Sequence, residues 1–140
     1  MTLSVSLSTI DQIEGEFVNL YSSVFGGWSN DGNCPYHVYI LKEGNDAIGF
    51  ASGFTIGLQT WYLQRAGFVK TEQKRVTNLY RASFAIKHIL EEWPYIMTFV
   101  HNEDYGAMRM VLALGFKIIG VRMDTARKLW VECLKEKDNG

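Results

Sequence analysis

The sequence of 140 residues predicts an α/β fold with a mixed central sheet of six to seven strands flanked by about four helices, in one domain over residues 1–140. Three observations predict it. Residues 37–69 contain three strand-like apolar runs with short connections, as in an antiparallel meander. A helical pattern over 76–93 then separates two strand-like runs, as in a parallel crossover. Finally, a helical pattern over 103–114 passes directly into a strand.

The first elements follow from local patterns. Residues 3–7 (LSVSL) alternate apolar and polar side chains, which predicts a strand. Residues 10–24 keep helical spacing of their apolar side chains, so we expect an amphipathic helix. Residues 28–36 are rich in turn formers and are expected to form a loop. The strands of the meander are expected over residues 37–42, 47–56 and 60–69.

The second half of the chain continues the sheet. The helix before Pro94 places one apolar face toward the core, and residues 95–100 form an apolar run typical of a central strand. Strands are expected at 116–122 and 128–134, and residues 135–140 are expected to form a polar tail. The apolar face of the helix comprises Val76, Leu79, Ala82, Ile86, Leu90 and Trp93.

Composition argues against several classes of protein. The chain has 14 basic and 15 acidic residues, so nucleic acid is an unlikely partner. No run approaches the ~18 apolar residues of a membrane span. Cys34 and Cys133 lack the spacing of a metal site and are expected to be free thiols. Because of this cysteine spacing, we expect a protein without a metal. The N-terminus lacks the pattern of a signal peptide, so we expect a cytoplasmic protein.

The stretch NEDYGAMRMVLALGFKIIGVR joins a helix to a strand without a linker. Asn102 is placed to begin the helix, and Ala107 and Met110 lie on one side of it. Gly115 suits the left-handed turn that satisfies the last helix carbonyls, and Phe116 can enter the core at once. This stretch therefore predicts a fold before it predicts any chemistry.

This stretch and the order of elements resemble the GNAT N-acetyltransferases. In that family an Asn begins the penultimate helix, an Ala and a Leu pack against the sheet, and Gly-Phe leads into the next strand. The resemblance implies the acyl-CoA N-acyltransferase (GNAT-like) fold over nearly the whole chain, acetyl-CoA as cosubstrate and an amine as acceptor. The matching positions are Asn102, Ala107, Met110, Gly115, Phe116, Gly120 and Arg122.

The resemblance also implies where CoA would bind. The pantetheine arm would pair with strand 60–69 where this strand diverges from 95–100, and the pyrophosphate would bind at the start of the next helix. In the family this turn reads Q/R-x-x-G-x-G/A. Gln73 matches the first position, but Val76 and Asn78 replace the two glycines.

Basic side chains surround the same turn: Lys70, Lys74, Arg75 and Arg81. They leave two interpretations open, a cation-assisted phosphate site or a solvated, charged start of a helix. The expected cofactor-binding residues are Phe68, Val69, Lys70, Lys74, Arg75, Val76, Thr77, Asn78 and Asn102.

Acyl transfer to an amine needs a base, and a donor for the charge that develops on the thioester. The family often supplies a Tyr four residues after the helical Ala, where this chain has Val111. The catalytic candidates are therefore His101 at a strand end, Tyr105 in the first helical turn, and Glu72 as a base. For each, a purely structural role is the alternative.

Two main functions follow. The first is an acyl-CoA-dependent N-acyltransferase with a CoA thioester and an unidentified amine as partners. The second is a catalytically degenerate GNAT-like module that serves in binding or structure, such as an internal virion protein of a bacteriophage. An enzyme that modifies nucleobases is a third alternative, which the near-zero net charge disfavours. Exposed sheet edges allow a homo-oligomer or a protein partner.

Overall fold

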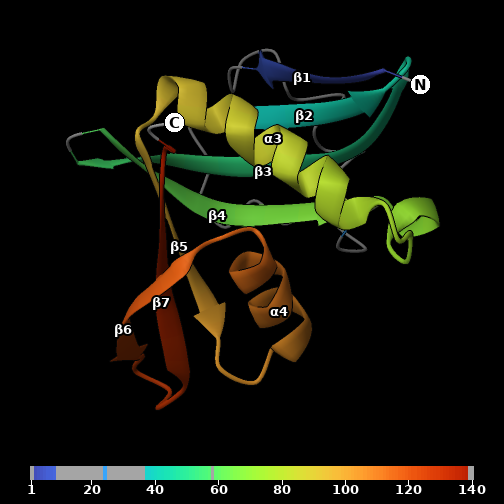
Figure 1. The fold of residues 1–140 in the computed structure, drawn as a ribbon. Helices are drawn as coiled ribbons and strands as arrows, with labels where there is room; N and C mark the ends of the chain where they lie inside the picture. Colours follow the sequence, from blue (N-terminus) through green and yellow to red (C-terminus); the bar gives the residue numbers. More distant parts are fainter. Residues whose placement is uncertain (1, 9–23, 25–36, 58, 139–140) are drawn as a thin grey trace.

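The computed structural model describes residues 2–8, 24, 37–57 and 59–138. Its described strands form one seven-stranded mixed sheet in the order β1-β2-β3-β4-β5-β7-β6 (Figure 1). Every neighbouring pair is antiparallel except β4 and β5, so the predicted meander and parallel crossover are confirmed. The strands are β1 (Leu3–Ser8), β2 (His37–Glu43), β3 (Asp46–Gly57), β4 (Thr60–Phe68), β5 (Tyr95–His101), β6 (Lys117–Met123) and β7 (Leu129–Glu136).

Two α-helices and one 3-10 helix lie in the described residues: α3 (Asn78–Glu92), α4 (Tyr105–Ala113) and η1 (Lys70–Glu72). The expectation of about four helices is thus corrected to two α-helices for this part of the chain. The predicted helix over 10–24 and the loop over 28–36 lie outside the described residues, except for Val24, which is helical.

Two predicted boundaries are wrong. Helix α3 begins at Asn78, and Val76, which we expected on its buried face, is 97% exposed. The first turn buries Asn78 and Arg81 instead, because both side chains find polar partners there. The polar tail begins later than expected, since residues 135–136 continue β7 and their backbone groups pair with β5.

The main core lies between the sheet and the helices α3 and α4, which cover the same face of the sheet. Ile86, Ile89 and Leu90 of α3 pack in one cluster with Trp61 of β4 and Ile96 of β5. Burying each such side chain contributes roughly 1.5–3 kcal/mol. A second cluster of Val38, Ile40 and Phe50, with Val24 packed against it, contains no residue of α3 or α4.

The junction after α4 has the predicted geometry. Gly115 adopts a φ of +92°, its N–H donates to Leu112 O at 3.0 Å, and the Phe116 N–H donates to Val111 O at 3.0 Å. This is the Schellman pattern of a glycine-terminated helix. Phe116 is buried in the main core, as expected.

The start of α4 differs from the prediction. Asn102 does not begin the helix, because the N-cap is Asp104, whose carboxylate accepts from the Ala107 N–H at 3.0 Å. An aspartate at this position satisfies an otherwise unpaired N–H and complements the helix dipole.

Strands β4 and β5 pair over only three positions, Thr60 with Tyr95, Trp61 with Ile96 and Tyr62 with Met97. Beyond Tyr62 the two strands have no further register, which confirms the predicted divergence. A β-bulge lies at the same point on the other edge of β4, where this strand pairs with β3. Ser52 pairs with Arg65 and Gly53 pairs with Leu63, so Gln64 is the extra residue. A bulge bends its strand, which explains why β4 leaves β5 here.

Gly53 makes the bulge possible. A Cβ at this position would collide with the carbonyl oxygen of Tyr62, so only glycine permits the approach of the two backbones. The sequence marks this place by the glycines spaced through β3.

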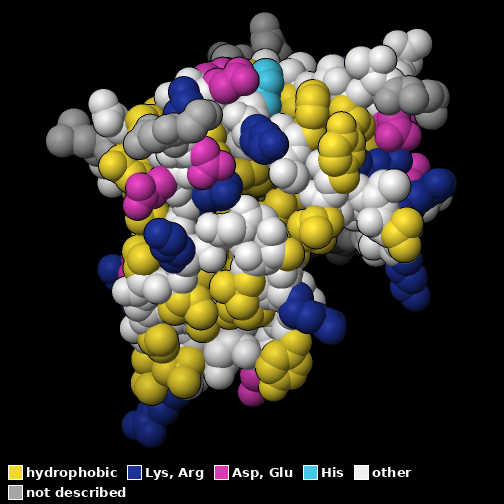
Figure 2. Space-filling model, viewed as in Figure 1, with side chains coloured by type: hydrophobic (Ala, Val, Ile, Leu, Met, Phe, Trp, Pro, Cys, Tyr) yellow, Lys and Arg dark blue, Asp and Glu magenta, His cyan; other side chains and the backbone are white. Residues whose placement is uncertain are grey.

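Strand β6 is the free edge of the sheet beside β7. Four of its apolar side chains are more than half exposed, and hydrophobic side chains gather at this end of the molecule together with α4 (Figure 2). They are Ile118, Ile119, Val121 and Met123.

Candidate functional site

A cavity of about 530 Å³ opens where β4 and β5 diverge, on the face that carries α3 and α4. Its floor includes residues 63–68 of β4, and small side chains line its helical sides, among them Ala82 and Ala85 of α3 and Ala107 of α4. The outline of the molecule is hollowed between the η1–α3 lobe and α4 (Figure 2). The cavity is therefore a mostly apolar channel of the size typical of small-molecule sites.

A side-chain hydrogen bond joins β4 and β5 at the point where the two strands begin to diverge. Thr98 Oγ1 of β5 donates to the carbonyl oxygen of Leu63 at 2.8 Å, directly after the last paired residues of β4 and β5. Further along β4, its edge toward β5 has no partner strand among the described residues. Alternate N–H and C=O groups of such an edge can bind an extended ligand as a further strand would.

The loop between β4 and α3 follows directly on Phe68, which lines the cavity, and folds into successive turns. The N–H groups of Glu72, Gln73, Arg75 and Asn78 each donate to a carbonyl three residues earlier in the chain. The N–H groups of Val76, Thr77, Leu79 and Tyr80 have no acceptor among the described residues. At the start of a 15-residue helix, four donors that lack an acceptor among the described residues are the features that attract an anion.

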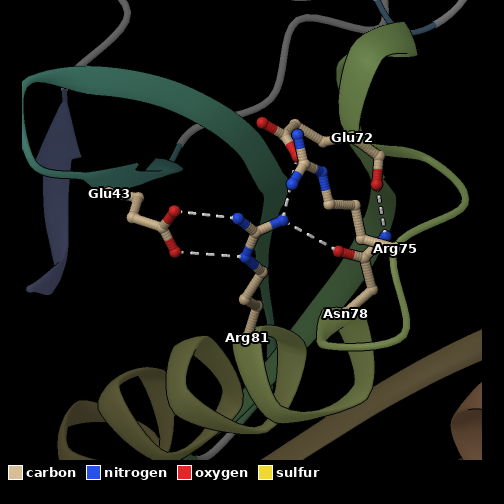
Figure 3. A network of polar contacts seen from close by, with 5 residues as sticks. All are labelled: Glu43, Glu72, Arg75, Asn78 and Arg81. Atoms are coloured by element: carbon tan, nitrogen blue, oxygen red, sulfur yellow. Dashed lines mark hydrogen bonds and ion pairs between the residues drawn. The ribbon is translucent and has the colours of Figure 1, made fainter. Parts of the chain in front are cut away.

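Arg81 organises this loop through a buried polar network (Figure 3). Its guanidinium donates in bidentate fashion to Glu43, with Nη2 to Oε1 at 3.0 Å and Nε to Oε2 at 3.3 Å. Nη1 donates to Glu72 Oε2 at 3.2 Å and to Asn78 Oδ1 at 3.1 Å. The network thereby ties the β2–β3 hairpin to the start of α3.

Asn78 completes the network. Its amide nitrogen donates to the Glu72 carbonyl oxygen at 2.6 Å, so a buried side chain adds a second hydrogen bond to a carbonyl that also accepts from the Arg75 N–H. Gln73 acts similarly from outside, since its Nε2 donates to the Phe68 carbonyl oxygen at 3.1 Å. Side-chain hydrogen bonds thus hold a turn that in the GNAT family is built with glycines.

The predicted basic cluster divides into two kinds. Arg81 is buried between two carboxylates, and Arg75 Nε lies 2.6 Å from Glu72 Oε2, so both cations already have anionic partners. Lys70 and Lys74 are exposed in the same loop. Glu72 is held by Arg75 and Arg81, which gives it a structural role in place of the one we expected for a base.

The other expected cofactor-binding residues lie around this loop. Phe68 lines the cavity, whereas Val69 donates its N–H to Ile48 O and packs toward the second core cluster. Thr77 is the N-cap of α3, although its side chain makes no capping hydrogen bond. Because the Val76 side chain is exposed, packing does not fix it in a position that would cover the N-terminus of α3.

A second pocket of about 700 Å³ lies on the opposite side of the sheet. Along β5 and β7, Val100 and Val131 belong to the core under the helices, so the alternating Phe99 and Trp130 point to the other face. Residues 64–66, Phe99 and Trp130 line both cavities. The two cavities therefore meet at the gap between β4 and β5.

His101 lines the first cavity at the end of β5. Its Nδ1 accepts from the Glu103 N–H at 3.2 Å, so a neutral ring carries its proton on Nε2. The Trp130 ring packs against it edge to face, with centroids 5.1 Å apart. Sequence reasoning named His101 but assigned no tautomer, and this arrangement favours a hydrogen-bond donor.

Sequence reasoning missed Trp130, Phe99 and Asp124. Asp124 Oδ2 accepts from Trp130 Nε1 at 2.9 Å, and Oδ1 accepts from the N–H groups of Ala126 and Lys128, each at 2.9 Å. The hydrogen bond from Trp130, with those from the two backbone N–H groups, lowers the pKa of Asp124. Asp124 thus orients the Trp130 ring, which packs on His101. The only sign of this role in the sequence is that Asp124 lies in a tight turn shortly before the strand that contains Trp130.

An Asp124→Asn variant should be less stable than the parent at neutral pH, because an amide group would face the indole N–H with another donor. Since folding lowers the pKa of the carboxyl group, its stabilisation is complete above the ordinary value of 3.8 and is lost as the pH falls through the lower folded value. The stability difference should therefore shrink below pH 3.8 in urea titrations between pH 7 and 2.5. A difference that stays constant to the lowest pH would contradict this assignment.

The remaining candidates lie apart from both cavities. Tyr105 is 70% exposed and does not line either described cavity. Asn102 is also exposed and lines neither cavity, and its N–H donates to Leu129 O.

Among the described residues, no group of three histidine, cysteine or acidic side chains could hold a metal ion. No α-helix in the described ranges has the length and apolar character needed to cross a membrane. Cys133 is buried and free, and Cys34 lies outside the described residues.

By sequence, no family model and no curated protein matches the chain. By structure, it is similar to a GNAT-family acetyltransferase from Bacillus cereus, with a TM-score of 0.73 and 18% identity over 99% of this chain and 100% of the other. An acetyltransferase from Bacillus subtilis in complex with CoA matches with a TM-score of 0.70 and 15% identity, over 96% and 99% of the two chains.

A third similar structure is a GNAT-family acetyltransferase from Elizabethkingia anophelis with acetyl-CoA bound, with a TM-score of 0.60 and 12% identity over 96% and 97% of the chains. These three neighbours give no support to the bacteriophage alternative. They show that this chain has the fold of the GNAT acetyltransferases.

Proposed function

We propose that the protein is an acyl-CoA-dependent N-acyltransferase. The observation that carries the proposal is the divergence of β4 and β5 beyond Tyr62, with a cavity on one side of the gap and a pocket on the other. The arrangement lets a thioester and an amine approach one another from opposite faces of the sheet. Proteins of the same fold bind CoA or acetyl-CoA, which supports this use of the cavity.

The residues present fit a CoA thioester. Beyond Leu63, the edge of β4 that faces β5 has no partner strand among the described residues, so it offers backbone groups for the amide groups of the pantetheine arm. The alanines of α3 and α4 leave room beside it. The unpaired N–H groups at the start of α3, with Lys70 and Lys74, would hold the pyrophosphate. Phe68 would contribute to the wall between these two regions.

The bound thioester supplies an activated acyl carbon. The amine nitrogen forms a bond to that carbon, the carbon–sulfur bond breaks, and the proton lost by the amine ends on the thiol. This chain contributes position and hydrogen bonding, because both cavities lead to the same gap. His101 Nε2–H would donate to the negative charge that develops during attack, the role for which its tautomer is suited.

Two observations favour the non-catalytic module as the second candidate. Val111 occupies the position where the family often has a tyrosine, and the loop before α3 lacks the family's glycines. The Arg81 network offers an alternative way of building that loop, and His101 offers an alternative donor. Binding of CoA distinguishes the two candidates.

The test is a titration of the protein with acetyl-CoA, read by calorimetry and by thermal unfolding. At a ligand concentration of about 100 times the dissociation constant, we expect a gain in stability of about 2.7 kcal/mol. Replacing Lys70 and Lys74 together by glutamate should weaken CoA binding at least roughly tenfold, because each loses a charge-assisted contact to phosphate.

The matched control reverses two exposed charges elsewhere, Lys87→Glu on α3 and Lys117→Glu on β6. This variant has the same net charge as the loop variant, so any general electrostatic effect is shared. It should bind CoA as the parent does. Absence of heat and of a thermal shift at millimolar CoA would reject the transferase and leave the module.

A further inference from the structure

The pocket on the far side of the gap has a definite chemical character. Its lining combines apolar or aromatic side chains with two guanidinium groups: Tyr62, Phe99, Met123, Trp130, Arg65 and Arg122. Tyr62 packs edge to face on Phe99 with ring centroids 5.8 Å apart, so two of the aromatic walls support each other. Burial raises the pKa of Tyr62, although the charge of Arg65 opposes the shift, so its hydroxyl stays a neutral donor at physiological pH.

Arg122 is the cation with the clearest geometry. Its guanidinium carbon lies 5.6 Å from the centroid of the Phe99 ring, and Nη2 is 3.7 Å from Glu132 Oε1, a distance too long for a strong hydrogen bond. The side chain is 69% exposed. The ring holds the guanidinium at the wall of the pocket while leaving most of its N–H groups available.

The carboxylate that lines the pocket does not offset this character by binding a cation. Asp124 already accepts three hydrogen bonds, from Trp130 Nε1 and from two backbone N–H groups. Three of the roughly four lone-pair positions of this carboxylate are therefore occupied, which leaves little capacity to bind a ligand ammonium. The described lining therefore favours a ligand anion over a polyamine or a lysine-like cation.

We propose that the amine acceptor is a free amino-acid-like molecule, a primary amine with an apolar body and a carboxylate; this inference rests on the proposed function. Arg122 would bind the carboxylate through the fork of guanidinium N–H groups. Phe99, Trp130 and Tyr62 would contact the apolar body. Nearby guanidinium charges also lower the pKa of a bound amine, which favours the neutral form that acyl transfer requires.

The test uses the protein saturated with CoA and two probes that differ by one carboxylate, phenylalanine and phenethylamine. We expect calorimetry to show at least roughly tenfold tighter binding of phenylalanine, since a hydrogen bond to a charged group contributes about 1.5–3 kcal/mol. In the Arg122→Gln variant the two probes should bind within about twofold of each other, whereas the affinity for CoA stays that of the parent. The matched control is Arg109→Gln on the exposed side of α4, which should keep the full preference.

Other outcomes overturn the inference in distinguishable ways. If CoA binds but phenethylamine binds as well as phenylalanine, the assignment of the acceptor fails and the transferase stands. If CoA itself does not bind, both proposals fail. A third probe, the dipeptide phenylalanyl-aspartate, separates the two sources of a carboxylate: tighter binding than free phenylalanine would assign the pocket to acidic peptides and reject the free amino acid.

Discussion

Replacing Arg81 with methionine is expected to lower the free energy of unfolding by about 3 kcal/mol. The guanidinium is buried and contacts Glu43, Glu72 and Asn78, so its removal leaves two carboxylates without a counter-charge. This value lies at the lower end of the range for a broken buried ion pair, because the side chains of Glu43 and Glu72 are still 24% and 16% exposed to solvent. Urea unfolding followed by circular dichroism measures the effect.

The matched control is Arg75→Met. Arg75 also contacts Glu72, but its side chain is 58% exposed, so the loss should stay below about 1 kcal/mol. A double variant, Glu43→Gln with Arg81→Met, should recover part of the lost stability because it removes one uncompensated charge. If Arg81→Met and Arg75→Met cost the same, the network does not organise the loop as described.

Replacing His101 with asparagine, whose amide oxygen can accept in place of Nδ1 but which has no donor at the position of Nε2, is expected to reduce kcat for acyl transfer by about 10²–10³-fold, the usual effect of removing one donor to developing negative charge. The affinity for CoA should change little, because His101 makes none of the contacts proposed for the phosphates or for the pantetheine arm. Steady-state kinetics with the preferred amine and calorimetry with CoA separate the two effects. Since this variant keeps a side-chain amide, folding is expected to be preserved.

His88→Gln serves as the control for His101. His88 lies on α3 and lines neither described cavity, and its ring centroid is 6.3 Å from that of the Tyr39 ring. Its kcat should stay within about threefold of the parent, a change of about 0.7 kcal/mol in the activation barrier. A His101→Asn enzyme that retains the parental kcat would remove His101 from the proposed chemistry.

Most of the fold could be predicted from local patterns. Alternating or continuous apolar runs between turn signals placed the strands, and the helical period after residue 75 placed α3, because side-chain patterns reflect which faces each element buries. The glycine turn after α4 was predictable for a related reason: Gly115 occupies a backbone conformation that side chains disfavour, so its position is visible in the sequence.

The candidate site was less predictable. The basic residues before α3 look equivalent in the sequence, yet Arg81 is buried between carboxylates from different elements while Lys70 and Lys74 are exposed. The partner that distinguishes them, Glu43, lies 38 residues away in the chain. No local pattern could have assigned that ion pair.

The order of strands and helices, the crossover from β4 to β5 and the end of α4 follow from local sequence patterns, because each depends on neighbours along the chain. Which polar side chains face the gap depends on how distant segments pack together. His101, Trp130 and Asp124 come together because β5, β7 and the turn before β7 meet there. Such contacts are set by strand register and by the bulge that separates β4 from β5, which depend on pairing between distant segments.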